Sequence, residues 1–287
     1  MCTSGVISAV DREGKKRVFL FKTVDYDLVG AWHAVVRSGR GYDALAIGMV
    51  PQLGINSGLN EKGLGVCMSY LDVKGVEDSA KVESRMPARW AGDDRGLANA
   101  AVLASCTTVE EAIEYYYDFV AKHPGTVGGN HMLADATGNI AVFEHSNGEA
   151  RHAYYTDTGF AARGNNGLLV IQKQQELLPE EIKKDRMVRY QKMNEFLAGL
   201  HFELKNGLND EVIVQKIKGI LSYHAPTGVD QPGSICTHNL QLNGARTNQP
   251  LPGCWTITSV IFDIMKLKCY FSIGNPCQDQ WGTISFS

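Results

Sequence analysis

The sequence lacks the features that would place it in several large classes of protein. It has no block of basic residues and no charged tail, since 28 Lys and Arg nearly balance 31 Asp and Glu for a net charge of −3. No apolar run approaches the length of a membrane helix. The start, MCTSGVISAVDREGKKR, is unlike a secretory signal because its short apolar stretch precedes the basic cluster. We therefore expect a cytoplasmic protein that binds neither nucleic acid nor a membrane.

Internal repeats, low-complexity segments and a linker rich in Pro, Gly or Ser are also missing. A chain of 287 residues can bury one large core or two small ones. Because no segment clearly divides the chain, we expect a single domain over residues 1–287.

The cysteines do not form a recognisable framework. Seven of them are an odd number in a long chain, which argues against a set of disulfides. Cys236-x-His238, followed by three further cysteines, raises the possibility of zinc. However, the usual C-x₂-C and H-x₃-H pairs are absent, so we expect no metal and most cysteines reduced and buried.

The pattern of apolar residues predicts strands at both ends of the chain and in its middle. Val6–Val10 and the run at 18–25 flank the polar turn DREGKK. Another strand should follow the turn Asn60–Gly63. Two strands should flank the turn Ala136–Asn139. The chain should end in a hairpin of residues 255–264 and 269–273.

Helices are predicted in the stretches between these strands. The first begins with a capping box, Thr107-x-x-Glu110, and has apolar residues at helical spacing. Two others should cover roughly 180–200 and 210–221. Blocks of strand followed by blocks of helix favour an α+β fold of stacked sheets covered by helix layers.

Cys2 is the most informative single residue. Methionine is normally removed before a side chain as small as cysteine, so the mature chain is expected to start at Cys2. That residue would carry a thiol beside an α-amino group. Since an unperturbed amine titrates at roughly 7.7–8.0, the amine can act as a base toward its own thiol at neutral pH. This is the pairing that nucleophilic catalysis requires.

Several segments, in order, are similar to N-terminal-nucleophile (Ntn) hydrolases that cleave linear amides. The chain resembles the acyl-coenzyme A:6-aminopenicillanic acid acyltransferase family and, less closely, the choloylglycine hydrolase and penicillin V acylase family. The segments are Met1-Cys2-Thr3, FKTVD at 21–25, NEKGL at 60–64, NHMLADATGNIAVFE at 130–144, RGNNG at 163–167, DRMVR at 185–189 and GNPC at 274–277. The resemblance implies a four-layer αββα sandwich of two mainly antiparallel sheets, with the cysteine at a cleft between them.

The resemblance also implies roles for residues near the nucleophile. Asp25 matches an aspartate that would hold the amine and adjust its basicity. Lys22 stands where the family usually has arginine. Lysine keeps the positive charge but lacks the planar guanidinium group of arginine. It would favour the thiolate electrostatically, or it is a plain lysine at a strand edge.

Further residues follow from later motifs. Asn165 matches the asparagine that donates to the tetrahedral oxyanion, and Asn166 is a neighbour that leaves the assignment open by one position. Tyr70 would complete the anion pocket through its backbone N–H or its hydroxyl, or is a core tyrosine. Of Arg186 and Arg189 in DRMVR, we prefer Arg189 as the arginine that reaches the active cysteine.

The expected activity is amide cleavage through a thioester acyl-enzyme on Cys2. The alternative is acyl-coenzyme A-dependent N-acyl transfer, because hydrolysis and transfer differ only in the final nucleophile. The expected partner is a small-molecule amide, with a coenzyme A thioester as an optional co-substrate and no cofactor. A catalytically silent ligand-binding member is a further alternative. Relatives often assemble, so a homo-oligomer stays open.

Overall fold

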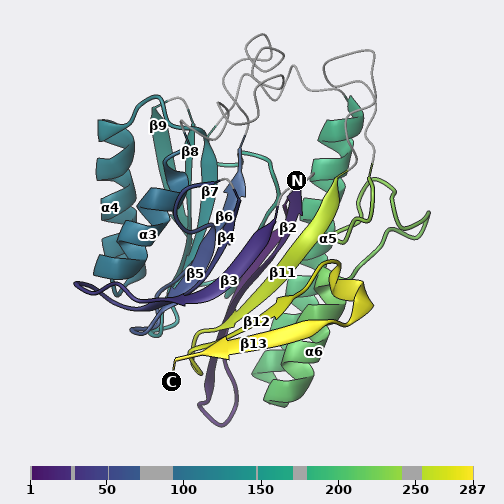
Figure 1. Ribbon diagram of the computed structural model, residues 1–287. Helices are drawn as coiled ribbons and strands as arrows, with labels where there is room; N and C mark the ends of the chain where they lie inside the picture. The colour runs from purple at the N-terminus through teal and green to yellow at the C-terminus, as the bar shows by residue number, and fades with distance from the viewer. Residues whose placement is uncertain are drawn as a thin grey trace.

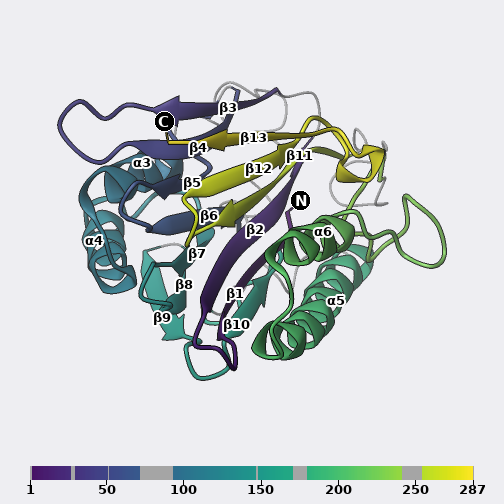
Figure 2. The same cartoon turned by 90° about the horizontal axis from the view of Figure 1, so that it is seen from below.

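The computed structural model describes residues 2–26, 30–50, 52–71, 93–146, 148–170, 180–240 and 254–286. In these ranges the strands form two antiparallel sheets that lie between two helix layers (Figures 1 and 2). The chain therefore has the α+β, four-layer αββα arrangement that the sequence predicts.

The first sheet carries the N-terminal end of the chain. The order of its strands is β10-β1-β2-β11-β12-β13. The bounds are β1 Ser4–Val10, β2 Lys16–Tyr26, β10 Phe160–Arg163, β11 Trp255–Asp263, β12 Lys268–Ser272 and β13 Trp281–Ser285. Strand β1 is therefore central enough to pair on both sides, with β10 and with β2.

The second sheet follows the order of the chain, β3 to β9. Its bounds are β3 Ala31–Val36, β4 Ala44–Met49, β5 Ser57–Asn60, β6 Gly65–Tyr70, β7 Gly129–Ala134, β8 Ile140–Ser146 and β9 Glu149–Tyr154. Each strand pairs with its neighbour in sequence, so short turns suffice for most connections.

Helices cover the outer face of each sheet. Helices α3 (Arg95–Ser105) and α4 (Val109–Lys122) contact the second sheet, and α5 (Glu180–Lys205) and α6 (Asp210–Leu221) contact the first (Figure 1). None of these described helices is long and apolar enough to cross a membrane.

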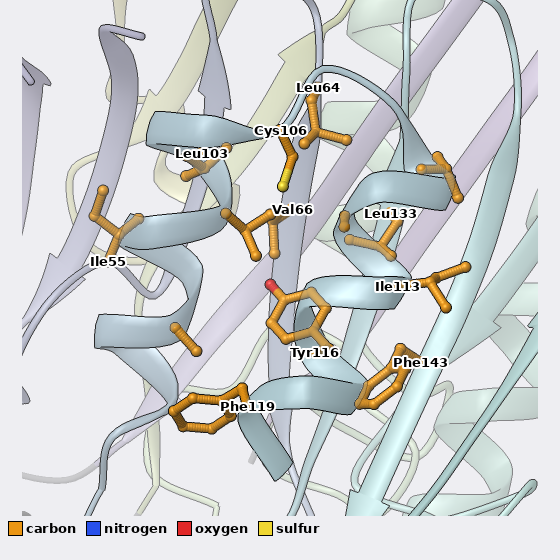
Figure 3. Close-up of a cluster of buried hydrophobic side chains, with 14 of the residues drawn as sticks. Ile55, Leu64, Val66, Leu103, Cys106, Ile113, Tyr116, Phe119, Leu133 and Phe143 are labelled. Carbon is orange, nitrogen blue, oxygen red and sulfur yellow. The ribbon is translucent and has the colours of Figure 1, made fainter. Parts of the chain in front are cut away.

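Apolar side chains fill the space between the two sheets and the space under each helix layer. Leu20 and Phe262 of the first sheet meet Leu45 and Leu59 of the second in one buried cluster. Under α3 and α4, Tyr116 packs among Leu103, Val66 and Phe143, as Figure 3 shows. Because successive strand residues point to opposite faces of a sheet, alternate residues line the core between the two sheets, and the residues between them line the core under a helix layer.

The capping box of α4 lies one position later than predicted. Thr108 is the N-cap; its side chain accepts from the backbone of Glu111, and the Glu111 side chain accepts in return from Thr108. The predicted pair of Thr107 and Glu110 is therefore wrong. Glu110 instead accepts a hydrogen bond from Asn139, and the Glu111 carboxylate also takes the Thr107 N–H.

The other predicted elements compare closely with the structure. Helix α6 has the predicted bounds, and α5 continues five residues beyond the predicted end at position 200. Helix α3 was not anticipated. From the sequence we also expect loops around 25–45, 70–95 and 224–255 to shape a cleft, and each of these loops lies partly outside the described residues.

Candidate active site

Cys2 lies two residues before the start of β1 and is only 7% exposed. Two side chains from distant parts of the chain hold its backbone. Its nitrogen donates to Asn165 Oδ1 at 2.8 Å, and its carbonyl oxygen accepts from Arg189 at 2.9 Å. The position of this residue is thus fixed on both sides of its Cα atom.

Asn165 reaches Cys2 because β10 pairs with β1. Ser4 lies opposite Arg163, so the chain leaving β10 passes beside the residues that precede β1, Cys2 among them. The Asn165 amide nitrogen donates to the Tyr70 carbonyl at 2.8 Å. One side-chain amide therefore connects the start of the first sheet to the end of β6 in the second.

The turn that presents Asn165 is held by another asparagine. Asn130 on β7 donates to the carbonyls of Gly164 and Asn166, at 3.0 and 3.3 Å. Asn166 is also buried, and the contact that places it runs through its carbonyl. Asn165, in contrast, contacts Cys2 through its side chain.

Both arginines of the DRMVR segment lie on the buried side of α5 and contact this region. Arg189 donates to Thr3 Oγ1 at 2.8 Å as well as to Cys2, and it forms a buried ion pair with Asp185 one helical turn earlier. Arg186 donates to the Asn165 carbonyl at 3.1 Å. Arg189, the residue that the sequence analysis prefers, therefore contacts Cys2 directly, whereas Arg186 contacts the turn that carries Asn165.

Asp25 is buried near the end of β2. Its two oxygens accept from Thr256 at 2.7 Å and from Thr23 at 3.3 Å. Burial raises its pKa, and the charge of Arg189 and these two hydrogen bonds lower it without reversing the shift. The Thr23 hydroxyl also accepts from the Thr3 backbone at 3.2 Å, which links Asp25 to the residue after Cys2.

Lys22 lies on the opposite face of β2 from Asp25, because positions three apart on a strand point to opposite sides. Its ammonium is fully buried and donates to Asn56 Oδ1 at 2.9 Å and to the Met68 carbonyl of the second sheet. Burial raises the pKa of Cys67 to about 12, with Lys22 opposing the shift and Cys2 adding to it. Lys22 and Cys2 are therefore both neighbours of Cys67 between the sheets.

Arg95 is a buried cation near Cys2 that the sequence analysis missed. It forms an ion pair with Asp93 at 2.7 Å, and its guanidinium lies over the Tyr70 ring at 5.2 Å. Burial opposes its charge, but Asp93 outweighs that effect and, with Tyr70 and Cys2, raises the pKa of Arg95. Asp93-x-Arg95 at a helix start is the only signal that the sequence offered.

A second buried group lies behind Tyr70 and Arg95. His131 Nδ1 and the Tyr116 hydroxyl both contact Asn99 Oδ1, at 2.9 and 2.7 Å, and His131 Nε2 lies 3.1 Å from His145 Nε2. Because Asn99 Oδ1 can only accept, His131 carries its proton on Nδ1, and His145 donates to it. Burial lowers the pKa of both histidines, that of His145 to about 3.

Two further residues near Cys2 were not predicted. Thr256 pairs with Asp25 across β11 and β2, so its hydroxyl points at the carboxylate. Burial raises the pKa of Cys254 to about 11, and the charges of Asp25 and Cys2 contribute. Neither residue belongs to a motif: the pairing of β11 with β2 places Thr256, and Cys254 immediately precedes β11.

Cys2 thus has a fixed backbone and a hydrogen bond to the side-chain amide of Asn165. The same region holds four buried cations: Lys22, Arg95, Arg186 and Arg189. Buried donors of this kind stabilise developing negative charge more strongly than donors in water do. In the part of the chain that the structure describes, the group able to hold a metal ion is a different one: His224, Cys236, His238 and Cys277.

Comparison with known proteins identifies related sequences and folds. Residues 12–213 match the family described as acyl-coenzyme A:6-aminopenicillanic acid acyl-transferase. No curated protein is significantly similar to the chain.

Solved structures share the fold at low sequence identity. The Caenorhabditis elegans ortholog of N-acylethanolamine-hydrolyzing acid amidase is 16% identical with a TM-score of 0.53, covering 92% of this chain and 93% of its own. Penicillin V acylase from Agrobacterium tumefaciens is 16% identical with a TM-score of 0.52, covering 94% and 82%. A mutant conjugated bile acid hydrolase from Clostridium perfringens is 13% identical with a TM-score of 0.55, covering 99% and 92%. These likenesses, with the two stacked antiparallel sheets, show the fold of the Ntn hydrolases.

Proposed function

Because the chain belongs to the acyl-coenzyme A:6-aminopenicillanic acid acyltransferase family, we propose that it cleaves a linear amide C–N bond by acyl transfer to Cys2. The proposal rests on two hydrogen bonds to the Cys2 backbone. Asn165 accepts from its nitrogen and Arg189 donates to its carbonyl oxygen, both from buried positions. A residue that only began a strand would have no need of two such buried partners.

Removal of Met1 would convert the Cys2 nitrogen into an α-amino group at the same place. Asn165 Oδ1, 2.8 Å away, would then orient that amine beside its own thiol. The amine takes the proton of the thiol, and the sulfur attacks the carbonyl carbon of the substrate. The resulting ammonium returns the proton to the leaving amine, and a thioester remains on Cys2.

The oxyanion of the tetrahedral intermediate requires donors that are already in place. Asn165 carries two amide hydrogens; one binds the Tyr70 carbonyl, and we assign the other to the oxyanion together with a backbone N–H near Tyr70. Lys22 and Arg189 contribute positive charge, and Asp25 orients the amine. Water, a second amine or a thiol then resolves the thioester.

The test is amine release from a panel of N-acyl amines. The panel includes penicillin V, conjugated bile salts and N-acyl amino acids, assayed with the unaltered chain, Cys2→Ala and Cys2→Ser. We expect Cys2→Ala to lose turnover by roughly three orders of magnitude or more with its near-ultraviolet circular dichroism unchanged. Cys106→Ala, at a cysteine in the cluster under α3 and α4, serves as the control. Wild-type amidase activity in Cys2→Ala would overturn the mechanism.

The role of the amine has a separate test. N-terminal sequencing of the active form should read Cys2 as the first residue. An active form that keeps Met1 would exclude the α-amino group as the base, even if Cys2 remained the nucleophile.

N-acyl transfer from a coenzyme A thioester is a second candidate, because the matching family is described by that reaction. Hydrolysis and acyl transfer can be distinguished in an assay that supplies an acyl-coenzyme A and an amine acceptor together. A transferase forms the new amide faster than free acid, whereas a hydrolase forms free acid. A silent binding protein would turn over neither set, and iodoacetamide would label its Cys2 no faster than in the unfolded chain.

A further inference from the structure

Four side chains from two distant segments of the chain lie close together. His224, Cys236, His238 and Cys277 each offer one ligand atom, and these atoms all lie within 4.8 Å of one another. Two sulfurs and two imidazole nitrogens are a donor set that selects zinc in a tetrahedral geometry. None of these residues has a place in the reaction proposed for Cys2.

The sequence spacing concealed this cluster. His224, Cys236 and His238 belong to the segment after α6, whereas Cys277 lies on the short 3-10 helix η2 (Pro276–Gln278) between β12 and β13. Because η2 lies against α6, the fold supplies the fourth ligand. A search for C-x₂-C and H-x₃-H pairs cannot detect a cluster assembled in this way.

The distances fit a metal site. The sulfur atoms of Cys236 and Cys277 are 3.7 Å apart, and both cysteines are free. In a tetrahedral site with Zn–S bonds of about 2.3 Å, two sulfurs lie roughly 3.8 Å apart. His238 Nε2 is 3.1 Å from Cys277 Sγ.

The surrounding hydrogen bonds orient the ligands. His224 Nδ1 lies 3.0 Å from the Cys236 carbonyl, which can only accept, so Nδ1 carries the proton and Nε2 is left to coordinate. A backbone carbonyl on the second ring nitrogen is the usual support of a zinc-bound histidine. Asn275 donates to the Thr237 carbonyl at 2.7 Å and holds the loop between the two ligands Cys236 and His238.

We propose that His224, Cys236, His238 and Cys277 bind one Zn²⁺ ion as a structural site. Four protein ligands close the coordination sphere, and a closed sphere leaves no position for substrate or water. The ion would cross-link the segment after α6 to the end of the first sheet.

This cross-link would also support the candidate active site. Thr237, between two of the ligands, donates from its backbone to Thr256 Oγ1 at 3.0 Å, and that hydroxyl donates to Asp25 at 2.7 Å. In the same segment, Gly233 donates to Asp185, the partner of Arg189, at 2.9 Å. Zinc would therefore hold the partners of both Asp25 and Arg189 in place.

The test measures metal binding directly. The full chain, reduced and stripped of metal, is titrated with Zn²⁺ and with Co²⁺. We expect about one ion per chain by elemental mass spectrometry, and thiolate-to-cobalt charge-transfer absorption typical of a tetrahedral site. Zn²⁺ should also raise the melting temperature, since a ligand that binds only the folded state stabilises it.

Two ligand variants are chosen at the accessible side of the cluster, where substitution should leave the fold intact: Cys277→Ser and His238→Ala. We expect each to weaken Zn²⁺ affinity by more than about 100-fold and to lose the zinc-dependent rise in melting temperature. The matched controls, Cys106→Ala and His152→Ala, should bind as the unaltered chain does.

Three results would overturn the proposal. One is a reduced, folded chain that takes up no Zn²⁺. Another is unaltered affinity in both ligand variants. The last is a chain isolated without metal in which Cys236 and Cys277 form a disulfide that reduction does not convert into a zinc site. None of these measurements depends on the reaction at Cys2.

Discussion

The carbonyl oxygen of Cys2 accepts a 2.9 Å hydrogen bond from the guanidinium of Arg189, a residue 187 positions later in the chain. The same nitrogen donates to Thr3 Oγ1, and Asp185 holds the other side of the guanidinium. One planar cation thus ties helix α5 to the residues that enter β1. Together with Met193, Leu197, Leu200 and Leu204, which lie in one buried apolar cluster with residues of β1 and β2, this contact holds α5 against the first sheet.

Arg189→Lys should destabilise the fold and reduce turnover together. Lysine keeps the charge but cannot reach Asp185, Cys2 and Thr3 at once. We expect a loss of about 2–3 kcal/mol in the free energy of unfolding, because hydrogen bonds to charged groups contribute about 1.5–3 kcal/mol each. Urea unfolding measures this loss. Lys216→Ala, in an exposed pair with Glu203, is the control and should change stability by less than about 0.5 kcal/mol.

Asn165→Asp should separate binding of the Cys2 nitrogen from stabilisation of the oxyanion. The carboxylate keeps an acceptor for the nitrogen but loses the N–H donors. We expect kcat to fall by about 100- to 1000-fold. Asn166→Asp is the matched control and should have a much smaller effect, because Asn166 accepts the hydrogen bond from Asn130 through its backbone carbonyl. Equal losses in the two variants would contradict the assignment to Asn165.

Much of the fold was predictable because apolar periodicity is a local property. Helix α6 and the hairpin of β7 and β8 follow directly from spacing and turn residues. The capping box of α4 was placed one residue early because two threonines and two glutamates are adjacent, so two overlapping boxes fit the same pattern. Only the three-dimensional path of the chain decides between Thr107 and Thr108.

The residues of the candidate site also fall into two groups, those that sequence motifs indicate and those that only the tertiary structure places. Cys2, Asp25, Asn165 and Arg189 stand in motifs, and the structure brings them together. Thr256 reaches Asp25 through pairing between strands separated by most of the chain, and sequence spacing carries no information on such a pairing. Arg95 was missed for a related reason: its burial beside Tyr70 depends on how α3 lies over β5 and β6.

Lys22→Met should reduce the reactivity of Cys2 more than the stability of the fold. A buried charge costs several kcal/mol in desolvation, and its two bonds to neutral oxygens return about 1.5–3 kcal/mol each. These effects nearly cancel, so we expect stability to change by less than about 1 kcal/mol. Alkylation by iodoacetamide at pH 7 should slow clearly, since a nearby cation favours the thiolate. Lys216→Met controls for the loss of a lysine, and an unchanged alkylation rate in Lys22→Met would exclude this role.

The buried histidine pair should make the fold sensitive to acid. His131 and His145 are neutral in the folded state because burial lowers the pKa of each, to about 3 for His145. The unfolded chain binds protons near pH 6.5, so stability is unaffected above that value and falls as the pH drops from about 6.5 toward 3. Each histidine contributes a slope of up to about 1.4 kcal/mol per pH unit.

Urea unfolding between pH 7 and pH 4 measures that slope. In His145→Gln the amide can still donate to His131, but one titrating group is gone, so the slope should be shallower. His152→Gln, at an exposed position on β9, should keep the original slope. A slope that is the same in all three proteins would assign the acid sensitivity to other groups.

Thr256→Val should alter the acid limb of the pH–rate profile. The Thr256 hydroxyl donates to Asp25 Oδ1 and accepts from the Thr237 backbone, so its loss removes a hydrogen bond that favours the charged form of Asp25. The pKa of Asp25, already raised by burial, should rise further, and activity that needs its negative charge should begin to fall at a higher pH. We also expect a cost of about 1–3 kcal/mol in unfolding free energy, because buried polar groups lose their partner. Thr256→Ser keeps the hydroxyl and should restore the original profile; an acid limb that stays in place in Thr256→Val would show that Asp25 does not act through this hydrogen bond.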